Sequence, residues 1–116
     1  MYKAIPVLIV LTLLAACNSS EDAVPAQYVQ FDTMVLIMAD IQVVEAKGNL
    51  ARNGSMVEDN KVGIKTDYEQ VFFNYHTSQA RFDSSYTYYA RNPKLLDKLY
   101  EKSIEELNRR NTQALK

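Results

Sequence analysis

Few side chains in this sequence have the types and spacing that catalysis requires. Asp40 and Glu45 are the obvious pair of carboxylates, but five helical positions turn them about 140° apart around the axis. Carboxylates that divide one reaction between them must face the same cleft. His76 is the only histidine, and catalytic or metal-binding histidines usually act with a second residue at a regular spacing. The sequence therefore predicts no enzyme, no metal site and no cofactor.

The N-terminus carries the most specific motif of the chain. Lys3 precedes an apolar run, which ends in the sequence Leu14-Ala15-Ala16-Cys17. A basic residue, a short apolar stretch and small residues are the parts of a secretory signal peptide, and the run is shorter than the roughly 20 residues of a membrane-spanning helix. The cysteine after the small pair resembles a bacterial lipobox, so we expect residues 1–16 to be removed and Cys17 to be lipidated. The alternative is an ordinary secretory signal followed by a chance cysteine.

Lipidation would anchor the protein to a membrane of the cell envelope. Because Cys17 is the only cysteine, no disulfide within the chain can support the fold. Loss of Lys3 with the signal peptide leaves 12 of the 13 basic side chains against 14 acidic ones, and nucleic-acid binding requires a basic face. We expect an outer-membrane lipoprotein with no nucleic-acid partner, on the periplasmic side rather than the cell surface.

The rest of the chain has the periodicity of helices. Residues 17–30 are predicted to form a flexible tether, and residues 31–116 a helical domain. The first helix, from Phe31 to about residue 49, has apolar residues at three- and four-residue steps, namely Met34, Ile37, Met38, Ile41, Val44 and Gly48. Residues 50–64 predict a long connection, and Thr66 with Glu69 predicts the start of a second helix. Further boundaries are expected near residue 76 and at Asn92-Pro93. The predicted fold is all-α, a small antiparallel bundle of about four helices.

Two sets of charged side chains have expected structural roles. The neighbours of Asp40 one helical turn away are apolar, namely Leu36, Ile37, Val43 and Val44. Since an unpaired buried charge is costly, we expect Asp40 to bond a tyrosine hydroxyl or Ser85; a ligand-binding role is the alternative. Glu105 and Arg109, and likewise Glu106 and Arg110, lie four residues apart, and they predict two ion pairs on the outer face of the last helix.

A cluster of tyrosines is the candidate binding feature. Six of them fall between residues 68 and 100. Tyr88 lies off the stripe that Phe82 begins, so we expect it to be exposed, with Arg81 or Arg91 at the rim of an aromatic and cationic patch. Tyrosine and arginine are common at binding surfaces, although tyrosine also fills helical cores when its hydroxyl has a partner.

Several segments together resemble a known family. They are Met34-Val35, Asp40, Glu45-Ala46, Phe72, Tyr75, Phe82-Asp83-Ser84-Ser85, Tyr88-Tyr89, Asn92-Pro93 and Leu99-Tyr100-Glu101. In this pattern the sequence is similar to the helical domain of a lipoprotein family of Bacteroidota catalogued as domain of unknown function 4296. The resemblance runs from about Met34 to Leu107. It implies a small helical envelope domain and supplies no catalytic residue. Such chains often have a glycine at the helix joint that His76-Thr77 occupies here.

These features favour a non-enzymatic accessory lipoprotein that docks onto another envelope protein. The alternative is a module that binds a small ligand or a lipid in a tyrosine-lined pocket between helices. A cavity of a few hundred Å3 with convergent polar groups would favour the ligand-binding module, and a solid core would favour docking.

Overall fold

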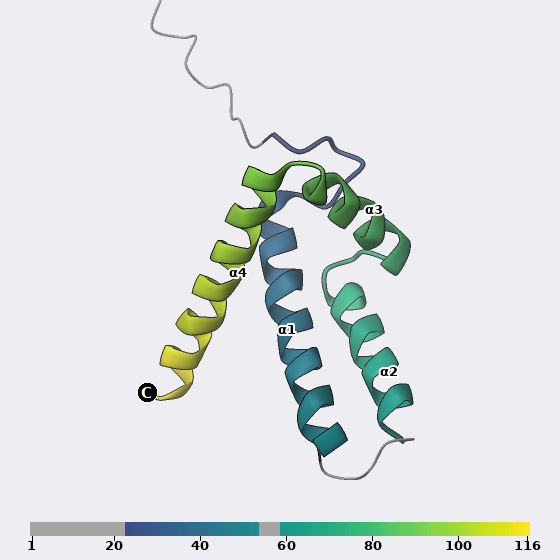
Figure 1. The fold of residues 1–116 in the computed structure, drawn as a ribbon, viewed down its shortest axis with the longest axis vertical. Coiled ribbons are helices and arrows are strands. Elements are labelled where there is room, and N and C mark those ends of the chain that lie inside the picture. The colour runs from purple at the N-terminus through teal and green to yellow at the C-terminus, as the bar shows by residue number, and fades with distance from the viewer. Residues whose placement is uncertain (1–22, 54–58) are drawn as a thin grey trace, which may run out of the picture.

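The computed structural model describes residues 23–53 and 59–116 of the chain. Four helices make up most of this part: α1 (Phe31–Asn53), α2 (Asp59–Asn74), α3 (Gln79–Ala90) and α4 (Pro93–Ala114), as Figure 1 shows. The described residues contain no strand. The prediction of an all-α fold with about four helices is confirmed.

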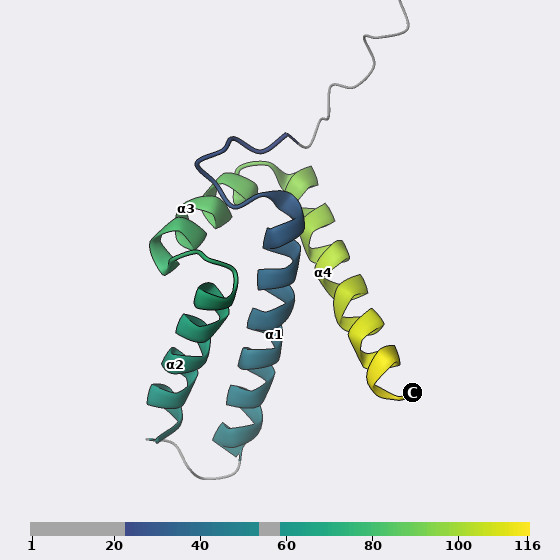
Figure 2. The same ribbon diagram turned by 180° about the vertical axis from the view of Figure 1, so that it is seen from behind.

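Helix α1 lies in the middle of the fold, with α2 on one side of it and α4 on the other (Figure 1). Cα atoms come within 8 Å of each other between α1 and α2, α2 and α3, α3 and α4, and α4 and α1, whereas among the described residues α1 does not approach α3 in this way, nor α2 α4. The expected antiparallel order holds for α1 and α2. By contrast, α3 lies across one end of the molecule, so that α4 runs alongside α1 in the same direction (Figures 1 and 2).

Helix α1 supplies more of the buried hydrophobic residues than any other helix in the described part of the chain. The predicted apolar stripe is buried from Met34 through Gly48, and Met34, Ile37 and Ala39 are completely inaccessible to solvent. The other helices cover it with Val71, Phe72, Tyr89, Leu95 and Leu99, all buried. Burial of such side chains contributes roughly 1.5–3 kcal/mol each. Among the described residues, this core lies between residues 24 and 99.

The second helix begins earlier than the sequence predicted. It starts at Asp59, so Thr66 lies inside α2 and does not cap it. The sequence around Gly63 shows no apolar stripe. Of the residues there whose exposure is described, Gly63 and residues 65–67 are exposed, and a Cβ atom built on Gly63 would meet nothing within 4 Å. Periodicity reports a buried face, and a helical turn without one gives no such signal.

Two joints follow the expected boundaries. Asn92 caps α4, since its side chain accepts a hydrogen bond from the Leu95 amide. At the end of α2, the amides of His76 and Thr77 donate to the carbonyls of Phe73 and Phe72 at 3.1 and 3.0 Å, the bonding pattern of a Schellman motif. His76 therefore has a φ of 52°, a backbone conformation that glycine adopts more easily. This conformation is why a glycine is common at such a joint, and in this chain His76 adopts it.

Residues before α1 pack against the helices instead of forming part of the tether. Val29 is buried; its amide donates to Ser85 Oγ at 2.8 Å, and its carbonyl accepts a hydrogen bond from the Tyr89 hydroxyl at 2.9 Å. In Figure 2 this segment crosses the end of the molecule formed by α3 and the start of α4. The predicted tether boundary at Gln30 is thus wrong for residues 24–30, which belong to the folded domain.

Candidate binding site

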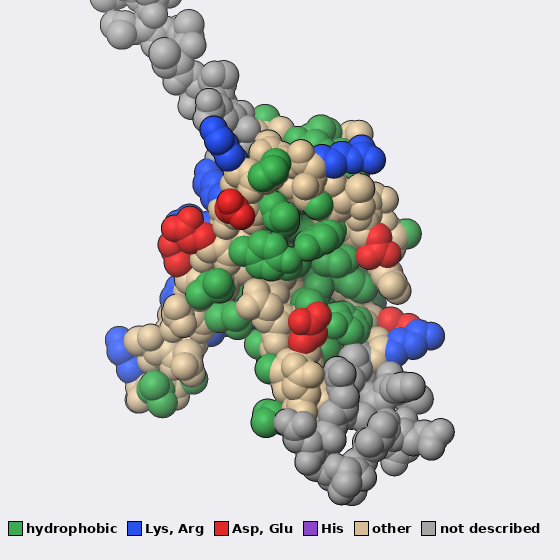
Figure 3. Space-filling model, in the orientation of Figure 1, with side chains coloured by type: hydrophobic (Ala, Val, Ile, Leu, Met, Phe, Trp, Pro, Cys, Tyr) green, Lys and Arg blue, Asp and Glu red, His purple; other side chains and the backbone are tan. Residues whose placement is uncertain are grey.

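A groove opens between the four helices on the side seen in Figure 1. Its volume is about 560 Å3. The floor is apolar, formed by Met38 and Ile41 of α1 and by aromatic side chains from the other three helices. The space-filling view shows this apolar band across the middle of the molecule (Figure 3). The groove thus lies over α1 and is bounded by side chains of α2, α3 and α4.

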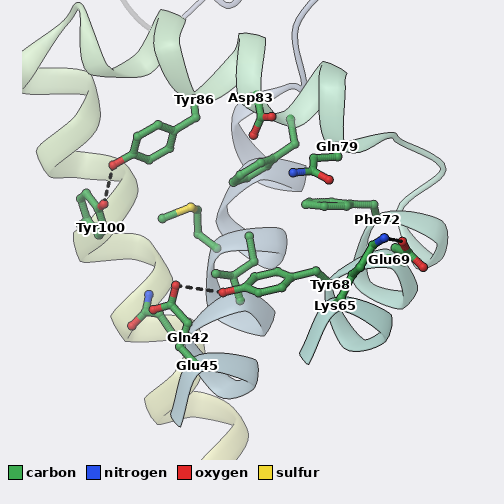
Figure 4. Close-up of a pocket in the computed structure, with 13 residues that line it drawn as sticks. Gln42, Glu45, Lys65, Tyr68, Glu69, Phe72, Gln79, Asp83, Tyr86 and Tyr100 are labelled. Carbon is green, nitrogen blue, oxygen red and sulfur yellow. Dashed lines mark hydrogen bonds and ion pairs between the residues drawn. The ribbon is translucent and has the colours of Figure 1, made fainter. Parts of the chain in front are cut away.

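Aromatic side chains form most of the groove wall. They come from α2, α3 and α4 and are Tyr68, Phe72, Phe82, Tyr86 and Tyr100. The four of them labelled in Figure 4, all but Phe82, converge on one space. The ring centroids of Phe72 and Phe82 lie 5.1 Å apart, and those of Phe82 and Tyr86 lie 6.2 Å apart. These separations are typical of aromatic pairs in contact, so the wall is continuous from α2 to α3.

Three tyrosine hydroxyls of the groove have partners within it. Tyr68 donates to Glu45 Oε1 at 3.1 Å, and the hydroxyls of Tyr86 and Tyr100 share a hydrogen bond of 2.8 Å. That bond, together with partial burial and the negative charge of Glu45, raises the pKa of Tyr100 to about 12. The phenol is therefore neutral at physiological pH and can donate or accept a hydrogen bond.

The rim of the groove is acidic. Three carboxylates line it, those of Glu45, Glu69 and Asp83, together with the ammonium group of Lys65. Lys65 lies 3.9 Å from Glu69. A further polar group, the side-chain nitrogen of Gln42, is buried and has no hydrogen-bond partner among the described residues. The groove thus combines an apolar floor, neutral phenols and an excess of negative charge.

A second hollow, of about 670 Å3, lies between α1 and α4. Four of its charged side chains are paired: Lys102 with Glu105 at 2.8 Å, and Arg109 with Glu106 at 2.7 Å. These pairs stand in place of the predicted pair of Glu105 and Arg109. Hydrogen bonds from Arg109 and Arg110 also lower the pKa of Glu106 to about 2. Because these groups already satisfy each other, the aromatic groove is the stronger candidate.

Asp40 lies outside the groove and joins three parts of the fold. Its Oδ2 atom accepts a hydrogen bond from the hydroxyl of Tyr75 at 2.7 Å, so a tyrosine is its partner, as expected. Its Oδ1 atom accepts a hydrogen bond from Arg110 of α4, whose Nε also donates to Glu106 at 2.7 Å. The predicted pair of Glu106 and Arg110 forms, but Arg110 turns inward to α1, a contact that periodicity did not indicate.

The electrostatic effects of this network agree with its geometry. Burial raises the pKa of Tyr75, and its hydrogen bond to the carboxylate of Asp40 raises it further. The hydrogen bond to Asp40 is also the main cause of the raised pKa of Arg110. Tyr75 thus remains a hydrogen-bond donor, and Arg110 a cation, at physiological pH.

The structure places Ser85 away from Asp40. It is buried on α3, where its hydroxyl accepts from the Val29 amide and lies 2.6 Å from the Arg81 carbonyl, to which it donates. Ser85 is therefore not the partner of Asp40; it holds the segment before α1 in place.

The predicted patch around Tyr88 is covered in part by the chain itself. The Tyr88 ring stacks on Tyr28 with centroids 4.7 Å apart, and it is only partly exposed. The guanidinium of Arg81 donates to backbone carbonyls of the same segment, at 3.3 Å for Tyr28 and 3.4 Å for Gln27. Tyr88 is thus less exposed than expected, because Tyr28 stacks on its ring. Arg81 is exposed, but its guanidinium is bonded to residues 27 and 28. Arg91 is exposed at the end of α3.

The remaining predicted site residue, Cys17, lies outside the described residues, as does the predicted signal peptide. In the described part of the chain, no three His, Cys, Asp or Glu side chains are grouped so that they could hold a metal ion. No helix of that part is both long enough and apolar enough to cross a membrane.

The fold and the groove define a small helical domain with an aromatic site between its helices. A family model described as a domain of unknown function, number 4296, matches residues 25–113, and the chain belongs to this family. The match includes the docked residues before α1. No curated protein and no solved structure matches the chain.

The Asp40 network yields a prediction about stability. Replacement of Asp40 by alanine leaves Tyr75 and Arg110 without their shared partner, and loss of one member of such a buried bond typically costs about 1–3 kcal/mol. We expect Asp40→Ala to lower the free energy of unfolding by this amount in urea denaturation. Glu101→Ala, which removes an exposed carboxylate of α4, should change it by less than about 0.5 kcal/mol. Equal effects of the two substitutions would contradict the assigned role.

Proposed function

We propose that this protein is a lipid-anchored binding module of the cell envelope, with the aromatic groove as its binding site. The sequence supports the anchor through the signal-like run that ends at Cys17. The groove supports the binding role. The proposal assigns the domain no catalytic activity.

The observation that carries the proposal is the groove itself. Its volume of about 560 Å3 lies within the roughly 300–1,000 Å3 typical of ligand sites, which combine an apolar lining with a few placed polar groups. Here the lining is aromatic, and the polar groups are the tyrosine hydroxyls and the carboxylates at the rim. Binding is favoured over acid–base chemistry because the hydroxyls of Tyr86 and Tyr100 already bond to each other, and that of Tyr100 is held neutral.

Docking of an envelope protein is the second candidate. The patch first expected to mediate docking, around Tyr88 and Arg81, is engaged by residues 24–30. The groove, however, is open along the side seen in Figure 3, and a segment of a partner protein could lie across it and insert a side chain. Either occupant would use the same aromatic wall.

In this proposal the domain stays close to the membrane. The first residue that the structure describes is Ala23, six positions after Cys17 (23 − 17). Since an extended chain spans at most about 3.5 Å per residue, the described part begins within roughly 20 Å of the lipidated residue. A ligand or partner would therefore be met near the membrane surface.

The anchor is tested by removing the thiol. Cys17→Ser should shift the protein from the membrane fraction to the soluble fraction, because no acyl chain can be attached, and mass spectrometry of the wild-type protein should show a lipid-modified N-terminal Cys17. Recovery of the wild-type protein with an unmodified thiol, or unchanged fractionation of the variant, would contradict the anchor.

The groove is tested with a neutral fluorescent probe, N-phenyl-naphthylamine, and the unlipidated mature chain, residues 17–116 with Cys17→Ser. We expect saturable binding with increased emission, because the apolar wall can take up an aromatic ring. Tyr100→Ala should weaken binding roughly 2- to 10-fold, the effect of one aromatic contact.

The matched control is Phe73→Ala. Phe73 is also an aromatic residue and is 74% exposed, but it does not line the groove, so its loss should leave the affinity unchanged. Absence of saturable binding by the wild-type chain, or equal effects of the two substitutions, would contradict the proposed function.

A further inference from the structure

We infer that the aromatic groove selects an organic cation, a ligand that joins an apolar body to a protonated amine or a quaternary ammonium group. This inference rests on the proposed function and specifies the ligand class of the same site. It follows from the charges at the rim, the aromatic wall and the state of the phenols, taken in turn.

The rim attracts positive charge. Glu45, Glu69 and Asp83 bring three carboxylates to the groove against the single ammonium of Lys65 among its described lining residues, and Lys65 lies beside Glu69. The carboxylates of Glu45 and Asp83 remain in excess. They belong to α1 and α3 and lie at opposite ends of the groove in Figure 4. A ligand in the groove is therefore placed between two negative charges, and an anionic ligand would be repelled by both.

The wall suits a cation with an apolar body. Aromatic rings attract ammonium groups through their π faces, by about 0.5–2 kcal/mol depending on how far the pair is removed from water. Five aromatic side chains line the groove, and Phe72 at its base is 6% exposed. The hydrocarbon part of a ligand can pack on Met38, Ile41 and Phe72, while its cationic group stays near the rim.

The phenols add hydrogen-bond acceptors to this arrangement. The pKa of Tyr100 is raised to about 12, so its hydroxyl is neutral at physiological pH. The oxygen of a neutral hydroxyl can accept a hydrogen bond from an ammonium group. The negative charge of Glu45 is one cause of that shift, which indicates that its field reaches across the groove from α1 to α4. The same field would act on a ligand cation.

The test compares three ligands with one naphthalene body: naphthylethylamine, which is a cation at neutral pH, naphthylethanol, which is neutral, and naphthylpropionate, which is an anion. Calorimetric titration of the unlipidated mature chain should show the amine binding about tenfold more tightly than the propionate, with the alcohol between them. The preference should decrease as salt is raised, since these charges are near the surface.

Substitutions at the rim separate the charge effect from damage to the site. The double variant Glu45→Gln and Asp83→Asn keeps the shape and the hydrogen-bond acceptors; it should weaken amine binding about fivefold and leave alcohol binding within about twofold. Glu105→Gln removes a carboxylate from the second hollow and should change neither.

Other results would contradict either the cation inference alone or the proposed function as well. An amine that binds no more tightly than the alcohol, or a double variant that weakens both equally, would overturn the cation inference and leave the groove as a binding site. Failure of all three ligands to bind would overturn the proposed function as well.

Discussion

The structure depends on one constraint: α1 is packed between α2 and α4, which do not approach each other in the described part of the chain. The apolar stripe of α1 is buried on both sides, so neither neighbour can move away without exposing it. Helix α3 then connects α2 to α4 across the end of the molecule and does not close down on α1. Residues 24–30 pack against α3 at that end, and the groove is open over α1.

The polar contacts reinforce this arrangement where apolar packing cannot. Because no Cα atoms of α2 and α4 come within 8 Å of each other among the described residues, Asp40 provides a link between them through Tyr75, just after α2, and Arg110 of α4. A carboxylate on an otherwise apolar face of α1 is costly alone and acceptable when both oxygens are bonded. Ser85 and Tyr89 serve the segment before α1 in the same way, since they satisfy the amide and carbonyl of Val29.

Much of the local structure was predictable because its signals are local. The stripe of α1 and the Asn92-Pro93 boundary follow from spacing and from capping chemistry, and both are found as predicted. The beginning of α2 was missed because the sequence between Asp59 and Thr66 has no apolar residues at three- or four-residue steps. Residues 24–30 were taken as a tether because acidic and polar residues precede them, although Val24, Tyr28 and Val29 are apolar or aromatic; their binding site on α3 is distant in sequence. The groove could not be predicted in detail, because its lining residues come from four helices whose relative positions the periodicity does not determine.

The groove over α1, bounded by α2, α3 and α4, is proposed as the binding site for a cation with an apolar body. The most direct measurement is an experimental structure of the unlipidated mature chain with naphthylethylamine bound. We expect the naphthalene ring to lie against Phe72 and Tyr100. The ammonium group should lie at hydrogen-bonding distance, about 3 Å, from Glu45 or Asp83. Binding of the amine in the second hollow between α1 and α4, or side chains that fill the groove and leave no room for it, would contradict the claim.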